Sequence, residues 1–177
     1  MEGICISIGC QCSPRIYIKN ALQLSKKQGY DSCPFDLCMT PYQALYDCLQ
    51  TDFQHFFDDL HLVEGDNADG DRSHCGRGLE NIRNKYGMTF NHEGSTHSHL
   101  FRNGTNDDLF YIRDDFLEFK KRYTARIANF HKYIEENERI ILIHSLFPGI
   151  CEVADLEAIC NILRERYPKK HFMYHQI

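Results

Sequence analysis

The sequence contains no apolar run that approaches the roughly 20 residues needed to cross a membrane. Its first ten residues, MEGICISIGC, lack both the basic region and the long apolar region of a signal peptide. Lysine and arginine form no long cluster and the formal net charge is −5, so the electrostatic signature of a duplex nucleic-acid-binding protein is missing. We therefore expect a soluble cytoplasmic protein that binds neither membranes nor duplex nucleic acid.

The chain also lacks internal repeats, low-complexity tracts and linkers that would divide it. Its 177 residues are close to the size at which a single hydrophobic core is the usual solution, so we expect one domain over residues 1–177. Residue 177 falls inside an apolar pattern typical of a strand. The sequence therefore leaves open that the domain is truncated at its C-terminal end.

Cysteine is abundant: there are nine, an odd number, without the regular spacing of a secreted disulfide framework. Together with the missing export signal, this pattern predicts free thiols in a reducing compartment. Several of these cysteines are expected to be small buried hydrophobes.

Short apolar segments alternate with amphipathic ones along the chain. The pattern predicts strands at 3–9, 139–144 and 171–177, and helices at 108–135 and 153–167. This alternation favours an α/β fold with a mostly parallel sheet flanked by helices.

The turn after the first strand is the best candidate for chemistry. Cys10 and Cys12 lie in it, and Ser13 and Pro14 then predict a helix start, with serine as the N-cap. A cysteine at a helix N-terminus has a lowered thiol pKa, which favours the nucleophilic thiolate. The alternatives are two structural thiols or a redox pair, although the C-x-C spacing is not that of the common C-x-x-C motif.

A thiolate nucleophile needs a base, and His92 is the best placed of the ten histidines. It ends a short predicted strand at 88–92; if that strand runs parallel to the first, His92 and Cys12 share one sheet edge. The alternative is a surface histidine.

Metal binding is the other chemistry to consider. His97 and His99 with Glu93 form a weak candidate metal site, and residues 66–71 resemble a calcium loop in composition only. We expect neither a metal nor a cofactor.

Several motifs resemble, in the same order, those of a family of uncharacterised papain-like cysteine peptidases. The matching segments are 6–14 (ISIGCQCSP), 33–36 (CPFD), 86–92 (YGMTFNH), 126–130 (RIANF) and the apolar strand at 140–143. The resemblance implies that Cys12 is the family cysteine, His92 the family histidine and Asp36 the carboxylate of the motif. The chain departs from the family at Leu37, where tryptophan is usual.

Two further departures concern Ser13, which precedes the proline with no acidic residue, and His144, at a position that is often basic. The family description also implies a papain-like α+β arrangement. The residues themselves favour α/β, because Cys12 directly follows a strand, whereas the papain cysteine opens a long helix with no core strand before it.

The leading hypothesis is a cysteine hydrolase or acyl transferase acting on an amide, isopeptide or ester bond. Cys12 would attack, His92 would act as base and then acid, and Asp36 would orient His92. The Cys12 and Ser13 amides, with the Gln11 side chain, would form an oxyanion hole. Arg15 would contact a substrate carboxylate or phosphate.

Two other classes remain open from the sequence. One is a non-catalytic binding or host-interaction protein on the same scaffold, and the other is a nucleotide or phosphoester hydrolase that uses the helix N-terminus as a phosphate cradle. The substrate, whether protein or small molecule, and the oligomeric state are left undetermined.

Overall fold

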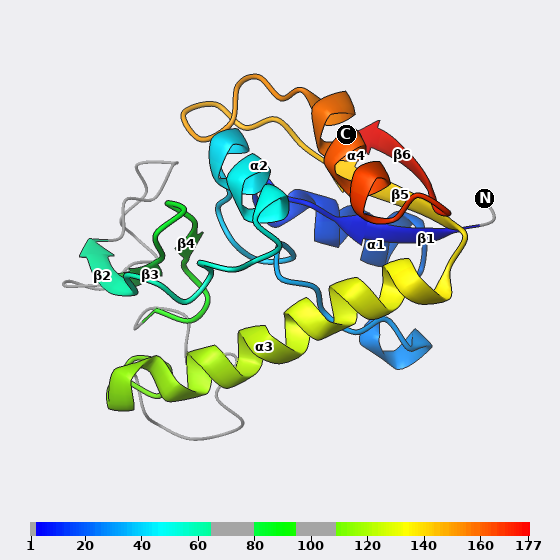
Figure 1. Ribbon diagram of the computed structural model, residues 1–177. Helices are drawn as coiled ribbons and strands as arrows, with labels where there is room; N and C mark the ends of the chain where they lie inside the picture. The colour runs from blue at the N-terminus through cyan, green and yellow to red at the C-terminus, as the bar shows by residue number, and fades with distance from the viewer. Residues whose placement is uncertain (1–2, 65–79, 95–108) are drawn as a thin grey trace.

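The computed structural model describes residues 3–64, 80–94 and 109–177. It is a mixed α/β structure with two separate three-stranded sheets, one parallel and one antiparallel. The long helix α3 (Arg113–Glu136) runs beside both sheets (Figure 1).

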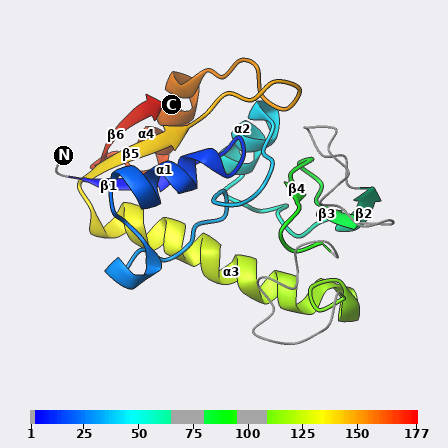
Figure 2. The same ribbon diagram turned by 180° about the vertical axis from the view of Figure 1, so that it is seen from behind.

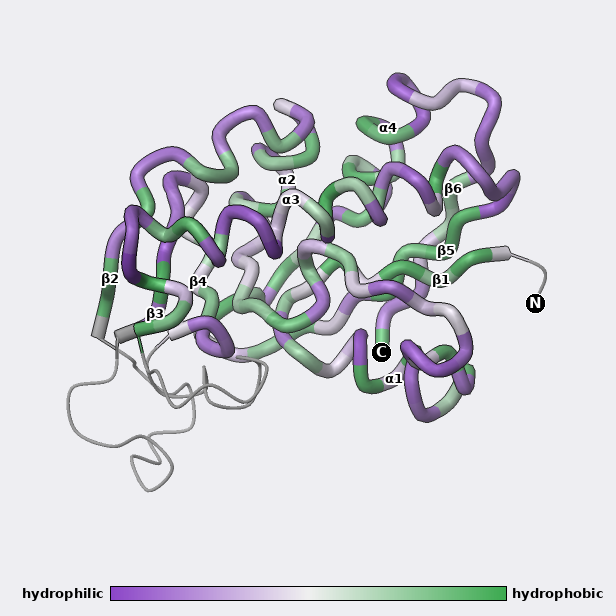
Figure 3. Tube along the Cα trace, turned by 90° about the horizontal axis from the view of Figure 1, so that it is seen from below, coloured by the Kyte–Doolittle hydropathy of each residue, from purple (hydrophilic) through white to green (hydrophobic). Residues whose placement is uncertain are grey.

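The parallel sheet has the order β1-β5-β6, with β1 spanning Ile4–Ser7, β5 Arg139–His144 and β6 His171–Gln176. The central strand β5 is buried over its last five residues, as its apolar, β-branched sequence RIILIH predicts. In Figure 3, β1 and β5 are mainly hydrophobic and lie among more hydrophilic segments. The predicted strands at the two ends of the chain and at 139–144 are therefore confirmed.

Helices cover both faces of this sheet. Helix α1 (Ser13–Ala21) lies in front of β1 in the view of Figure 2, while α4 (Leu156–Arg166) lies on the opposite side. Helix α2 (Tyr42–Gln50) packs against α4, and the short 3₁₀ helix η1 (Lys26–Gln28) follows α1.

The second sheet departs from the expectation of a mostly parallel fold. Strands β2 (His61–Glu64), β3 (Glu80–Arg83) and β4 (Thr89–Phe90) pair antiparallel in the order β2-β3-β4. The segment at 88–92 is thus not a parallel neighbour of β1. A strand of two residues carries too little pattern to show which partner it pairs with.

An aromatic cluster joins α3 to the second sheet. Phe90 of β4 packs edge-to-face on Phe119 and Tyr123, with ring centroids 4.9 and 4.8 Å apart, and Phe56 contacts the same group. These rings are fully buried, so they hold β4 and the chain that follows it against α3.

The start of α1 differs from the sequence-based expectation. The residue that caps α1 is Cys12 rather than Ser13, with Pro14 in the first turn. The residue that caps α2 is Pro41, and neither cap makes a side-chain hydrogen bond. The preceding residue, Thr40, is buried, and its hydroxyl contacts the Cys38 thiol at 3.1 Å.

Eight cysteines lie in the described part of the chain and all are free thiols, which agrees with the expected reduced state. Among the described helices, none has the length and apolar character of a membrane span.

Candidate active site

Cys12 is presented by a tight turn between β1 and α1. The turn is anchored on β5, because Ile8 donates its N–H to the Ile143 carbonyl at 2.9 Å and Ser145 donates to Gly9 at 3.3 Å. Cys10 points into the core and is fully buried, whereas Cys12 is half-buried at the start of α1. The structure therefore separates two cysteines that composition alone does not distinguish.

His92 reaches Cys12 from the second sheet. The Cys12 Sγ and the His92 Nε2 lie 3.2 Å apart, although 80 positions separate the residues in the chain. A nucleophile and a base at hydrogen-bond distance are the geometric requirement for thiol activation.

Segment 39–41 is the bridge that brings these two residues together. The N–H of Thr40 donates to the Cys10 carbonyl at 2.8 Å, two residues before the nucleophile. On its other side, Met39 pairs with Thr89 through two backbone hydrogen bonds of 2.9 Å. Thr89 begins β4, and His92 follows that strand. The dyad is therefore assembled across two sheets, not along the shared edge of one sheet.

The charge state of Cys12 differs from the sequence-based expectation. Burial, together with the nearby carboxylates of Glu93 and Asp36, raises the pKa of the Cys12 thiol to about 11. Since α1 has only nine residues and its first turn contains a proline, few free N–H groups oppose these effects. The raised pKa favours the protonated Cys12 thiol at neutral pH.

Glu93 is a residue that the sequence motifs assigned only to a weak metal site. Its carboxylate is fully buried and lies 2.9 Å from the Arg122 Nε and 3.4 Å from an Arg126 Nη. The Tyr123 hydroxyl donates to it at 3.2 Å. Glu93, the residue after His92, thus contacts three side chains of α3. The sequence signal for this cluster was the four-residue spacing of Arg122 and Arg126 in a helical pattern, which places the two arginines on one face of the helix.

Asp36 is buried, as expected for the apolar segment 33–36, and Pro34 and Phe35 are buried with it. The Cys33 N–H donates to its carboxylate at 2.9 Å, and the Arg15 Nε lies 3.4 Å from it. Burial raises the pKa of Asp36 to about 6, opposed by the Cys33 hydrogen bond and by Arg15. Both partners contact Oδ2 of the carboxylate and neither is His92, so the role of Asp36 in orienting His92 stays a prediction.

Arg15 is also committed internally. Besides the ion pair with Asp36, it donates to the Leu24 carbonyl at 2.9 Å and its guanidinium lies 4.1 Å from the Tyr30 ring centroid. Its side chain is only 12% exposed. The ion pair, the hydrogen bond and the ring account for the position of the cation without a substrate, and the expectation that Arg15 contacts substrate stays a prediction.

Gln11 and Ser13 flank Cys12 in the chain, and both are partly exposed. The Gln11 Nε2 donates to the Ser13 hydroxyl at 3.0 Å, which leaves the second amide N–H for another acceptor. The backbone N–H of Ser13, the first residue of α1, has no intrahelical acceptor. These groups are the available donors beside the thiol.

Cys10 lies on the buried side of the turn, next to another thiol. It neighbours the Cys151 thiol, and burial with this contact raises the pKa of Cys10 to about 12. The Cys151 Sγ lies 3.9 Å from the His144 Nε2. Cys10 is thus paired with Cys151 rather than with Cys12, which does not favour a C-x-C redox pair.

The metal alternatives receive no support from the described residues. His97, His99 and the calcium-like loop at 66–71 lie outside them. Within residues 3–64, 80–94 and 109–177, no group of three or more histidine, cysteine or acidic side chains could hold a metal ion.

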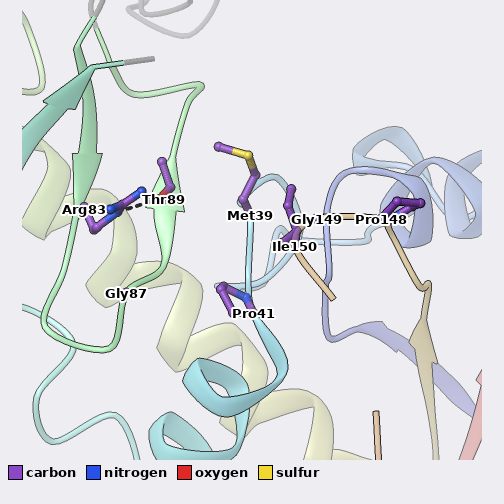
Figure 4. Close-up of a pocket in the computed structure, with 8 residues that line it drawn as sticks. All are labelled: Met39, Pro41, Arg83, Gly87, Thr89, Pro148, Gly149 and Ile150. Atoms are coloured by element: carbon purple, nitrogen blue, oxygen red, sulfur yellow. Dashed lines mark hydrogen bonds between the residues drawn. The ribbon is translucent and has the colours of Figure 1, made fainter. Parts of the chain in front are cut away.

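A pocket of about 300 Å³ opens beside segment 39–41, and neither Cys12 nor His92 lines it (Figure 4). Its walls come from segment 39–41, from the β3–β4 hairpin and from the loop at 148–150.

No family model, curated protein or solved structure matches the chain.

Proposed function

We propose that the protein is a cysteine-nucleophile hydrolase or acyl transferase that acts on an amide, isopeptide or ester bond. The observation that carries this proposal is the 3.2 Å separation of the Cys12 Sγ and the His92 Nε2. The order of motifs that resembles the papain-like cysteine peptidase family supports the same two residues.

In the first half of the reaction, the neutral Cys12 thiol attacks the carbonyl carbon as its proton passes to the His92 Nε2. The carbonyl oxygen becomes an oxyanion, which the Cys12 and Ser13 N–H groups at the start of α1 would stabilise. When the tetrahedral species collapses, the imidazolium returns the proton to the leaving nitrogen or oxygen, and a thioester on Cys12 remains.

In the second half, water or an acceptor amine or alcohol loses its proton to His92 and attacks the thioester. The carbon–sulfur bond breaks and the Cys12 thiolate takes the proton back from the imidazolium. Because Cys12 is a thiol before each turnover, His92 is required as a base in the acylation step.

Acylation by p-nitrophenyl acetate tests this proposal without knowledge of the natural substrate. We expect a burst of p-nitrophenol and a single acetyl group on Cys12 in the intact-mass spectrum, with no such group in Cys12→Ser. His92→Ala should slow acylation by roughly 10²-fold or more, since general base catalysis typically contributes 10²–10⁴.

The matched control is His171→Ala, because His171 is exposed at the start of β6, away from the dyad. It should acylate at the wild-type rate. Equal acylation rates in His92→Ala and His171→Ala, both shown to be folded, would refute the dyad and favour a non-catalytic binding protein.

The phosphoester hydrolase alternative is less well supported by the turn. Pro14 has no N–H to offer a phosphate, and Arg15, the adjacent cation, is already paired with Asp36.

A further inference from the structure

The pocket is built from segments that also position Cys12 and His92. Met39 and Pro41 flank Thr40, whose N–H donates to the Cys10 carbonyl. Thr89 lies three residues before His92, on the strand that leads to it. A ligand in this pocket therefore contacts segments that lead to both residues of the dyad, although neither residue lines the pocket itself.

The third wall of the pocket, the loop at 148–150, leads to a residue that contacts the turn between β1 and α1. Ile150 lines the pocket, and the next residue, Cys151, neighbours Cys10 of the nucleophile turn. The loop is closed on itself, because Phe147 and Cys151 exchange two backbone hydrogen bonds of 2.8 Å. Each of the three walls is thus linked to the nucleophile turn or to the strand that leads to His92.

The lining is apolar in one half and cationic in the other. Met39, Pro41 and Ile150 supply apolar surface, and they lie close to one another in Figure 4. Among the described lining residues, Arg83 is the one with a formal charge. A volume of about 300 Å³ is at the lower end of ligand pockets, enough for one side chain and its neighbouring backbone.

Arg83 is held in place while its outer edge stays available. It pairs with Thr89 across the β3–β4 hairpin, and its Nε donates to the Thr89 hydroxyl at 3.1 Å. The side chain is exposed, and within the described residues its two Nη groups have no ion-pair partner. Two parallel N–H donors on a fixed guanidinium are suited to a carboxylate.

We propose that this pocket binds the substrate beside the bond that Cys12 attacks, and that the substrate is a peptide-like chain with a medium-sized apolar side chain and an adjacent carboxylate. This inference rests on the proposed function for its link to Cys12. The carboxylate can be that of a chain end or of an acidic side chain, and the experiment separates these two sources.

Four electrophiles that alkylate a thiol provide the test. N-chloroacetyl-leucine has both the apolar side chain and a chain-end carboxylate; N-chloroacetyl-glycine lacks the side chain and N-chloroacetyl-leucinamide lacks the charge. N-chloroacetyl-glutamyl-leucinamide carries a side-chain carboxylate instead. Each alkylation forms a thioether at Cys12 and releases chloride. Rates from intact mass are divided by the iodoacetamide rate of the same variant, so that general changes in thiol reactivity cancel.

We expect N-chloroacetyl-leucine to react roughly tenfold faster than the glycine compound, the preference typical of an apolar pocket. One of the two carboxylate compounds should exceed the neutral leucinamide by roughly threefold to tenfold, as a charge-assisted pair allows. Arg83→Gln should abolish the carboxylate preference alone, and Ile150→Trp, which fills the pocket, should abolish the leucine preference. Lys85→Gln, an exposed cation of the same hairpin outside the pocket, is the matched control.

Equal normalised rates for all four compounds would overturn the inference. Binding of N-acetyl-leucine to Cys12→Ser, followed by NMR, keeps this outcome distinct from failure of the proposed function. If acylation does not depend on His92 but N-acetyl-leucine binding still depends on Arg83, the proposed function and the link of the pocket to Cys12 are refuted. The inferred class of ligand would stand in that case. Retained acylation without binding or selectivity would refute the pocket alone.

Discussion

The buried Cys12 thiol leads to a quantitative prediction for alkylation. With a pKa of about 11, the thiolate fraction at pH 8 is about 10⁻³, compared with about 10⁻¹ for a thiol at the ordinary value of 9.0. Iodoacetamide reacts with the thiolate, so Cys12 should react roughly 100-fold more slowly at pH 8 than an exposed cysteine in a peptide. Its rate should keep rising through pH 10.

The Glu93 carboxylate is the second contribution to this pKa, after burial. In Glu93→Gln, which removes the charge but keeps the shape, the midpoint of the pH–rate profile should move down toward 9. The assay follows alkylation of Cys12 from pH 6 to 11 by peptide mass mapping, with Cys12→Ser identifying the modified peptide. Thermal unfolding of Glu93→Gln establishes that the variant is folded, because Arg122 and Arg126 lose their buried partner.

A plateau in the wild-type profile with a midpoint below pH 8 would refute this reasoning. It would mean that an imidazolium on His92 holds Cys12 as a thiolate at rest, and that burial does not control the nucleophile. A midpoint unchanged by Glu93→Gln would refute the electrostatic part alone.

Two other buried groups give predictions for stability. Asp36→Asn should lower the free energy of unfolding by roughly 2 kcal/mol, because Arg15 loses its buried counter-ion. It should leave the His92-dependent acylation rate of the folded protein unchanged; loss of that rate would show that Asp36 orients His92 after all. Burial lowers the pKa of His144 to about 4, so protonation favours the unfolded chain, where the ordinary value is 6.5. Neutral, buried His144 should therefore contribute fully to the free energy of unfolding of the wild-type protein above pH 6.5, and about 3 kcal/mol of that free energy should be lost by pH 4. The free energy of unfolding of His144→Leu should fall less over the same range. Urea unfolding at pH 7 and pH 4 measures both, and equal acid sensitivity of wild type and His144→Leu would contradict the burial argument.

Local pattern was sufficient for the elements around the parallel sheet. The run RIILIH at 139–144 is β-branched and apolar throughout, and it forms the buried central strand. Gly9 and Pro14 flank the turn that carries Cys12, since β1 ends two residues before Gly9 and Pro14 lies in the first turn of α1. Burial of Asp36 followed from the apolar residues around it.

Pairing of the second sheet was beyond the reach of local pattern. Strand β4 has two residues, and the hydrogen bonds that position it come from Met39 and from β3. The Met39 contact joins segments tens of residues apart, and a strand of two residues has no periodicity that indicates its partners. His92 is therefore predictable as a candidate base, but its route to Cys12 is not.

The sequence by itself determined which residue types could react and where in the chain the strands of the parallel sheet lie, because these depend on neighbours within a few positions. Only the tertiary structure decided the charge of Cys12, the enclosure of Arg15 by Asp36 and Tyr30, and the pairing of Glu93 with α3. The physical reason is that desolvation and ion pairing depend on what surrounds a group in space. A helix N-terminus lowers a thiol pKa, but at Cys12 burial and two carboxylates act in the opposite direction and are larger.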